Sequence, residues 1–216
     1  MRKAFSDELN ATFDDLADMC ALVESAVNGA TKALMTGDAS TAEKVISGDA
    51  EIDKMRERIE EESFTLLSLQ APVASDLRLL VAALRMVSEV ERMGDLSVHV
   101  AKIARLRVPD LAVPAEMLSI MQRMAEVAVD MVTRVRQIII SRDVEAAIAL
   151  GRADEEMDQL RRQSFAELLS DNWTHGVEPA VDIALLGRYY ERIADHAVSI
   201  ASRVVYVVTG HRLEEQ

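Results

Sequence analysis

Cysteine, proline, glycine and aromatic residues are all scarce in this chain of 216 residues, which has one Cys, four Pro, eight Gly and 4% aromatic side chains. A single cysteine, Cys20, excludes an internal disulfide, and its place in a helical pattern predicts a small core residue rather than a nucleophile. Ala, Leu, Val, Met, Glu, Arg and Asp dominate instead. This composition is typical of an all-α protein, and the length suffices to bury a substantial core.

Basic residues and long apolar runs are also lacking. The 24 Lys and Arg residues are outnumbered by 37 Asp and Glu residues, which gives a net charge of −13 at pH 7. We expect no nucleic-acid partner, because phosphate backbones bind to basic surfaces; an acidic surface suits cations or basic partners. The most apolar segment, residues 198–208, is too short to cross a bilayer and contains Arg203, and no apolar segment typical of a secretory signal follows the N-terminal basic residues. We therefore expect a cytoplasmic protein that does not span the membrane.

Breaker residues divide the chain into six long helical segments. Pro109 and Pro114 mark a short connection in the middle, with three segments on each side. Short connections between long helices produce antiparallel bundles. The pattern predicts two repeated antiparallel three-helix bundles, residues 1–108 and 115–210, packed end to end or side by side about a pseudo-twofold axis. The expected helices cover 6–37, 40–69, 75–107, 115–141, 143–171 and 180–209.

The repeat is clearest in two segments one hundred residues apart, "EVERMGDLSVHVA" at 89–101 and "YYERIADHAVSIA" at 189–201. Glu91 and Glu191 interrupt the apolar seams of their helices, where Leu or Val is usual, and an Asp follows each of them by one helical turn, at Asp95 and Asp195. Like charges at this spacing repel each other by about 0.2–0.5 kcal/mol, and burial of either carboxylate unpaired costs more. An arginine, a proton or a metal ion is therefore expected beside them.

The second and fifth helices carry matching pairs of carboxylates, Asp49 with Asp53 and Asp154 with Asp158. Neighbouring helix axes lie about 8–10 Å apart, so four carboxylates can converge in each half. All-oxygen sites suit magnesium, manganese, calcium or iron, and zinc is possible. An alternative stays open: in so acidic a chain such pairs also arise by chance, and Arg92 and Arg192 can satisfy them as ordinary ion pairs.

At this point the sequence resembles a known family, the PhoU-type phosphate-signalling regulators. The residues that carry the resemblance are "LQAPVASDLRLLVAALRMVSEVERMGDLSVHVAKIA" at 69–104, which joins Pro-x-x-x-Asp-Leu-Arg to Glu-Arg-x-Gly-Asp, together with "YYERIADHAVSIA" at 189–201. The resemblance implies two related three-helix bundles with metal clusters, of iron or zinc, with manganese or magnesium as alternatives. It assigns one cluster to Asp49, Asp53, Glu91 and Asp95 and the other to Asp154, Asp158, Glu191 and Asp195. The second half departs from the pattern, because it lacks the Pro-x-x-x-Asp-Leu-Arg element.

The resemblance also implies a function. Such a protein is expected to be a non-enzymatic negative regulator of the phosphate-starvation response. It would link the ATPase subunit of a phosphate transporter to a sensor histidine kinase, act at the inner face of the membrane through these partners, and form a homodimer.

Two further interpretations belong to other classes of protein. A carboxylate-bridged di-metal enzyme of the ferritin-like kind is disfavoured, because no Glu-x-x-His occurs in the chain. A metal-free helical scaffold predicts that Leu or Met in place of Glu91 or Glu191 stabilises the fold through added apolar burial.

Overall fold

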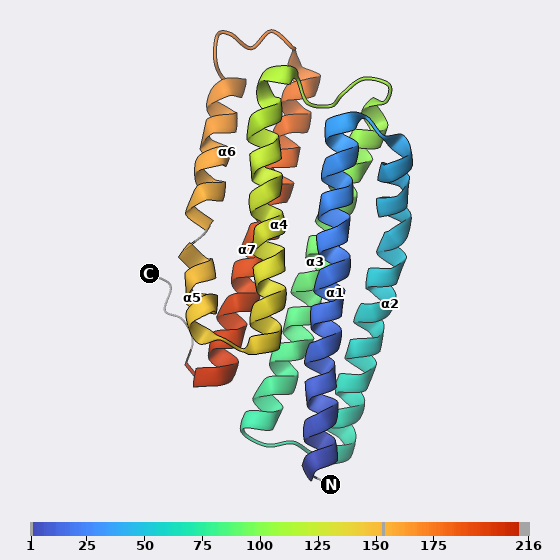
Figure 1. Cartoon of the computed structure of the whole chain (residues 1–216), viewed down its shortest axis with the longest axis vertical. Coiled ribbons are helices and arrows are strands. Elements are labelled where there is room, and N and C mark those ends of the chain that lie inside the picture. Colours follow the sequence, from blue (N-terminus) through green and yellow to red (C-terminus); the bar gives the residue numbers. More distant parts are fainter. Residues whose placement is uncertain (1, 153, 212–216) are drawn as a thin grey trace.

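The computed structural model describes residues 2–152 and 154–211, and every regular element in this part of the chain is a helix (Figure 1). The prediction of an all-α fold is therefore confirmed. No helix among these residues has the length and apolarity that crossing a membrane requires. The helices are α1 (Arg2–Thr36), α2 (Ala39–Gln70), α3 (Ser75–Arg107), a 3-10 turn (Ala115–Met117), α4 (Leu118–Ser141), α5 (Val144–Arg152), α6 (Asp154–Leu168) and α7 (Val177–Thr209).

The helix expected over 143–171 is seen as α5 and α6, which lie on either side of residue 153, a position outside the described residues. The last helix begins at Val177 rather than near Ala180, since Pro179 falls in its first turn, where a missing N–H has no cost.

The first connection shows how the sequence forces antiparallel neighbours. Gly37 follows α1 with a φ of +66°, a left-handed conformation that glycine adopts without strain. Asp38 then caps α2, and its side chain accepts a hydrogen bond of 3.0 Å from the backbone N–H of Thr41. With only two residues between the helices, α2 must turn back along α1.

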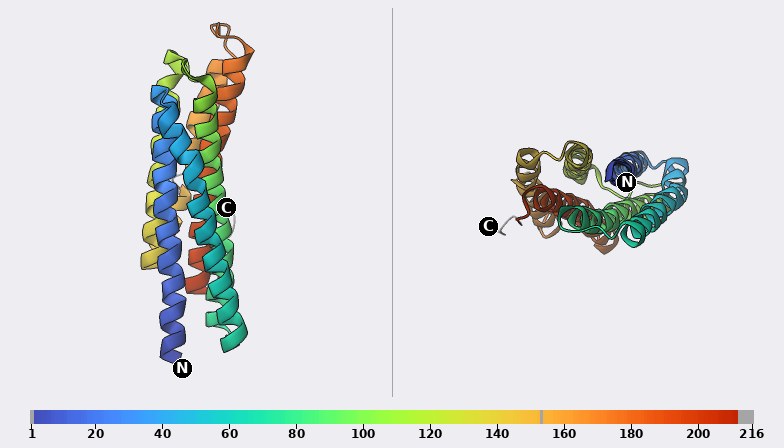
Figure 2. Two further views of the ribbon diagram at one scale, coloured as in Figure 1. Left: turned by 90° about the vertical axis from the view of Figure 1, so that its right-hand side faces the viewer. Right: turned by 90° about the horizontal axis from the view of Figure 1, so that it is seen from below.

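The two halves pack side by side. α1, α2 and α3 pack on one another, α4 to α7 do the same, and the halves meet through α1 against α4 and α3 against α7 (Figure 2). α3 and α7 run antiparallel: Arg107, at the end of α3, pairs with Asp182 near the start of α7, and Arg78, near the start of α3, lies over the ring of Tyr206 near the end of α7. The sequence of buried and exposed residues along 81–90 recurs unchanged along 181–190. The duplication in sequence is thus a pseudo-twofold arrangement in space.

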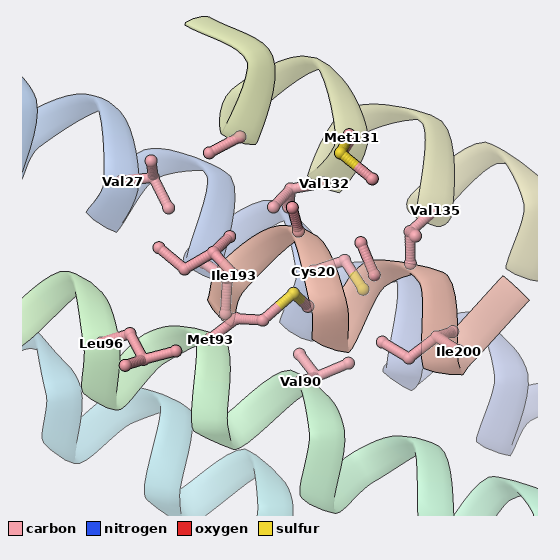
Figure 3. Packing of buried hydrophobic residues seen from close by; sticks show 14 of the residues in the cluster. Cys20, Val27, Val90, Met93, Leu96, Met131, Val132, Val135, Ile193 and Ile200 are labelled. Carbon is pink, nitrogen blue, oxygen red and sulfur yellow. The ribbon is translucent and has the colours of Figure 1, made fainter. Parts of the chain in front are cut away.

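One continuous core joins the halves. Side chains from α1, α3, α4 and α7 interdigitate between the two helix layers, among them Met93, Met131 and Ile193 (Figure 3). Cys20 lies in this core, fully buried, and burial raises the pKa of its thiol to about 12, so the thiolate needed for reactivity does not form at neutral pH. The expectation that Cys20 is a core residue is confirmed.

Candidate metal centres

In the first half, α2 and α3 bring the predicted carboxylates to one helix–helix contact. Gly94 of α3 makes the close approach possible: a Cβ at this position would stand 3.1 Å from Cδ1 of Ile52 and 3.7 Å from Oδ1 of Asp49. On the same helix, Glu91 is three residues before this glycine, and Asp95 directly follows it. The residue without a side chain therefore allows an α2 carboxylate to approach those of α3.

The charges of this group are incompletely compensated. Burial raises the pKa of Asp49, and the negative charges of Asp95 and Asp53 raise it further. Burial likewise raises the pKa of Glu91, with Asp95 as the next cause. Arg92 bonds to Asp95 at 3.0 Å but approaches Glu91 only to 3.7 Å, and its side chain is exposed. The four carboxylates of the first half are therefore coupled to one another and carry an excess of negative charge.

In the second half, arginines compensate the corresponding glutamate. Glu191 is buried, with 9% of its side chain exposed; Nη1 of Arg161 lies 2.5 Å from Oε1, and Arg188 donates to Oε2. Burial and the charge of Glu191 raise the pKa of Asp195. Asp158 is exposed and lies 3.8 Å from Arg162. The side chain of Asp154 lies outside the described part of the structure.

Both carboxylate oxygens of Glu191 are bonded to guanidinium groups, one to Arg161 and one to Arg188. The ion-pair alternative left open by the sequence is realised at this glutamate, but through Arg161 and Arg188 rather than Arg192.

Two substitutions between the repeats explain the difference. Arg56 of α2 corresponds to Arg161 of α6, but Arg56 bonds to Glu60 at 2.9 Å, whereas the position of Glu60 is occupied by Phe165 in the second half. Arg161 packs over the Phe165 ring, 5.7 Å from its centroid, and extends to Glu191 instead.

The second arginine has no counterpart at all. Arg188 corresponds to Ser88 of α3, whose hydroxyl bonds to the backbone carbonyl of Leu84. One salt bridge and one serine in the first half therefore leave Glu91 without the two arginines that hold Glu191.

The two donor sets differ in how well they suit a metal ion. Among the described residues, no three Asp, Glu, His or Cys side chains stand at positions that would hold an ion together. The first half offers oxygen donors with uncompensated charge, which is the chemistry of a site for a hard or borderline cation. In the second half, binding would have to displace two guanidinium groups. The eight-residue assignment made from sequence stays a prediction, and the first half fits it better.

The structure adds polar contacts beside these carboxylates that the sequence did not indicate. Glu89 of α3 bonds to Nδ1 of His196 at 2.7 Å and to Arg203 of α7 at 2.9 Å, and the hydrogen bond from His196 lowers the pKa of Glu89. His99 stacks on Tyr189, with ring centroids 5.2 Å apart. Both contacts cross from α3 to α7, so no helical spacing within one segment could reveal them. They tie the two halves together next to the carboxylate groups.

Fold and site together define a duplicated helical-bundle protein with equivalent acidic helix faces in its two halves. The chain belongs to the PhoU family, because the PhoU domain model matches it twice, at residues 16–104 and 121–204. The resemblance inferred from sequence is thereby confirmed.

Curated relatives match nearly the whole chain. It is 44% identical over 210 residues to the phosphate-specific transport system accessory protein PhoU homolog 2 of Mycobacterium tuberculosis, covering 97% of this chain and 99% of that protein. It is 31% identical to the PhoU homolog of Rhizobium meliloti, covering 96% and 88%. These names describe accessory proteins, and the prediction of a non-enzymatic protein is confirmed.

Solved structures agree. PhoU from Pseudomonas aeruginosa superimposes with a TM-score of 0.86 at 29% identity, covering 96% of this chain and all of that one. The phosphate transport system regulatory protein PhoU from Streptococcus pneumoniae gives a TM-score of 0.86 at 25% identity, covering 97% and 99%. The PhoU-like fold predicted from sequence is confirmed.

Proposed function

We propose that this protein is an accessory regulator of a phosphate transport system that restrains the phosphate-starvation response. The observation that carries the proposal is the near-full-length relationship to curated phosphate-specific transport system accessory proteins. The continuous core supports it, since a rigid body with accessible helix faces suits a protein that acts by contact.

The regulator would act by contacting both the ATPase subunit of the transporter and a sensor histidine kinase, at the cytoplasmic face of the membrane. To restrain the kinase only when transport proceeds, it must bind one state of its partners more tightly than the other, because equal affinities shift no equilibrium. The homodimer expected from the resemblance stays a prediction.

The carboxylates of the first half would hold a metal ion, for which iron or zinc is expected and manganese or magnesium are alternatives. Asp49, Asp53, Glu91 and Asp95 are the candidate ligands. The choice is supported by the raised pKa values of Asp49 and Glu91, which result first from burial and then from the negative charge of Asp95. A bound cation would neutralise that charge and present a positive centre on the α2/α3 surface. The second set would bind only after Arg161 and Arg188 release Glu191.

The regulatory proposal is tested by deletion of the gene in its own organism, with a reporter of the phosphate-starvation response. We expect the response to become active in high phosphate and to be repressed again by the wild-type gene. Purified protein should bind the ATPase subunit and the cytoplasmic part of the kinase. A reporter that stays repressed in the deletion strain would refute the regulatory role.

The metal proposal is tested by the metal content of untagged protein purified without chelator. Wild type is expected to contain close to one or more ions per chain. The pair of changes Glu91→Ala and Asp95→Ala should remove most of this metal, whereas Glu191→Ala with Asp195→Ala should remove less. If all three proteins are folded and free of metal, the acidic pairs are ordinary helix surface.

A further inference from the structure

Exposed apolar side chains gather at two corners of the molecule. Of the fifteen large apolar side chains exposed among the described residues, ten lie in the connections α2–α3 and α6–α7 or on the helical segments that flank them. We name these groups the α2/α3 corner and the α6/α7 corner. The first consists of Phe64, Leu69, Val73, Leu77 and Val81, and the second of Phe165, Leu169, Val177, Val181 and Leu185.

The two corners share equivalent exposed positions on α3 and α7. Leu77 and Val81 correspond to Val177 and Val181 at the interval of one hundred residues that relates α3 to α7. In each helix these residues are four positions apart and so share one exposed stripe. The α2–α3 connection lies at the opposite end of the molecule from the α6–α7 connection (Figure 1). The pseudo-twofold axis therefore relates the exposed apolar stripes of α3 and α7.

These exposed side chains are not explained by the fold. Leu69, Val73, Leu169 and Val177 are each at least 74% exposed, so they contribute little to the core. Apolar groups of this kind, set in a polar surround, mark sites of protein interaction.

The charges around the corners indicate the chemistry of the occupant. Residues 57–81 contain five acidic and two basic residues, and so do residues 158–185. Arg56 pairs with two acidic residues of the first segment and Arg107 with two of the second, so each segment with its pairing arginine has a net charge of −2. A second copy of this chain would bring like charges together at these surfaces. A segment with an apolar face and basic flanks would satisfy both the apolar and the acidic residues.

We propose that the α2/α3 and α6/α7 corners are equivalent docking sites for two amphipathic basic helices, one from each subunit of a twofold-symmetric protein partner. The symmetry of the partner would match the pseudo-symmetry of a single chain, so that both subunits make the same contact. Leu77 and Val177 begin antiparallel helices of 33 residues, so the two sites are about 45 Å apart along the bundle. The inference rests on the proposed regulatory function only for the biological identity of the partner.

The test uses a designed probe and the whole chain. The probe is an 18-residue helical peptide with Leu at positions i, i+4, i+7 and i+11 and Lys on its other face. It is used alone and as two copies joined by a polyproline linker of about fifteen residues, which spans about 45 Å. Binding is measured by calorimetry and fluorescence anisotropy at physiological salt, in the presence of a chelator. The variants are Val81→Lys, Val181→Lys and both together, all at exposed positions.

Ile140→Lys is the matched control, since Ile140 is 58% exposed on α4, outside both corners. We expect wild type and Ile140→Lys to bind two single peptides per chain, each corner variant to bind one, and the double variant to bind at least tenfold more weakly. The linked peptide should bind wild type at least tenfold more tightly than the single one and lose this advantage in either corner variant.

Several outcomes would overturn the proposal. One is that the peptide binds the double variant as tightly as it binds wild type. The others are that wild type binds a scrambled peptide of the same composition, or a peptide with Glu in place of Lys, as tightly as the designed peptide. A wild-type dimer that the double variant converts to a monomer would identify a second copy of the chain as the occupant. The measurement needs neither metal nor transporter, so its failure is distinguishable from a failure of the proposed function, which the reporter strain tests.

Discussion

Glu191 and Glu91 occupy equivalent positions but have opposite electrostatic surroundings. Two guanidinium groups hold Glu191, whereas the nearest arginine to Glu91 is the exposed Arg92 at 3.7 Å. A nearby cation at the surface contributes little, while a buried, hydrogen-bonded pair is costly to break from one side. The same substitution should therefore have opposite effects in the two halves.

Glu191→Gln is expected to lower the free energy of unfolding by about 1–2 kcal/mol. Hydrogen bonds to charged groups contribute about 1.5–3 kcal/mol each, and the value is reduced here because Arg161 and Arg188 reach solvent. Urea unfolding at pH 7 with chelator present measures it. Unchanged stability would show that the two arginines are equally well hydrated without their partner.

Glu91→Gln is expected to raise the free energy of unfolding by about 0.5 kcal/mol at pH 7 without metal, because it removes the repulsion from Asp95. The pKa of Glu91 is raised in the folded protein, so the native state holds this proton more tightly than the unfolded chain does. Stability therefore increases as the pH falls through the folded pKa, and the gain from Glu91→Gln should vanish near pH 4.

The same urea series, repeated from pH 7 to pH 4, tests this expectation. A loss of stability in Glu91→Gln at pH 7 would mean that a cation already compensates Glu91. The metal-free scaffold interpretation predicts stabilisation when either glutamate is replaced by Leu or Met. The structure supports that outcome for Glu91 alone.

At the scale of the helices, two glycines differ in how closely other atoms approach them. Gly29 of α1 faces α2 so closely that a Cβ would stand 2.8 Å from Cγ2 of Val45, whereas nothing lies within 4 Å of such an atom at Gly48 of α2. Alanine is the better helix former at both places, by about 1 kcal/mol. Packing decides which substitution is tolerated.

Gly48→Ala is therefore expected to raise the free energy of unfolding by about 0.5–1 kcal/mol, and Gly29→Ala to lower it by about 1–3 kcal/mol through overpacking. Thermal unfolding followed by circular dichroism compares the pair directly, since each variant is the control for the other. Equal stabilisation by both would show that α1 and α2 can separate without cost.

The elements also show where sequence is sufficient. The bounds of α3 follow from Pro72 and Pro109 outside its ends, and the six-helix pattern follows from apolar periodicity. The start of the last helix at Val177 rather than near Ala180 was not predicted, because Pro179 can stand in the first turn of a helix as well as before it.

The sequence predicted which carboxylates lie together in the first half, but not which basic residues pair with the carboxylates of α3 and α7. Helical spacing placed Glu91 and Asp95 on one face, and the structure brings Asp49 to them. The bond from Arg161 to Glu191 depends on Phe165 standing where the first half has Glu60, and the bond from Glu89 to His196 depends on how α3 meets α7. Such contacts follow from the packing of the halves, which local periodicity does not encode.

For the molecule as a whole, the continuous core implies that the two halves unfold together. Met86 of α3 is fully buried. The core to which it belongs extends from α3 through α1 and α4 to α7 (Figure 3). A cavity in one half therefore removes contacts that support the other. Trp173, the only tryptophan, lies in the α6–α7 connection of the second half and reports on that half alone.

Met86→Ala is expected to lower the free energy of unfolding by about 2–5 kcal/mol, and the melting temperature by about 2–4 °C for each kcal/mol. Because the core is shared, the melting curve from Trp173 fluorescence should shift as far as that from circular dichroism, although the substitution lies in the other half. Leu106→Ala, on the same helix but 70% exposed, should move neither curve appreciably. If instead the fluorescence transition stays in place while circular dichroism divides into two steps, the halves are independent folding units. Their contact would then be free to open, and a regulator that opens would have a different mechanism from one that acts as a rigid body.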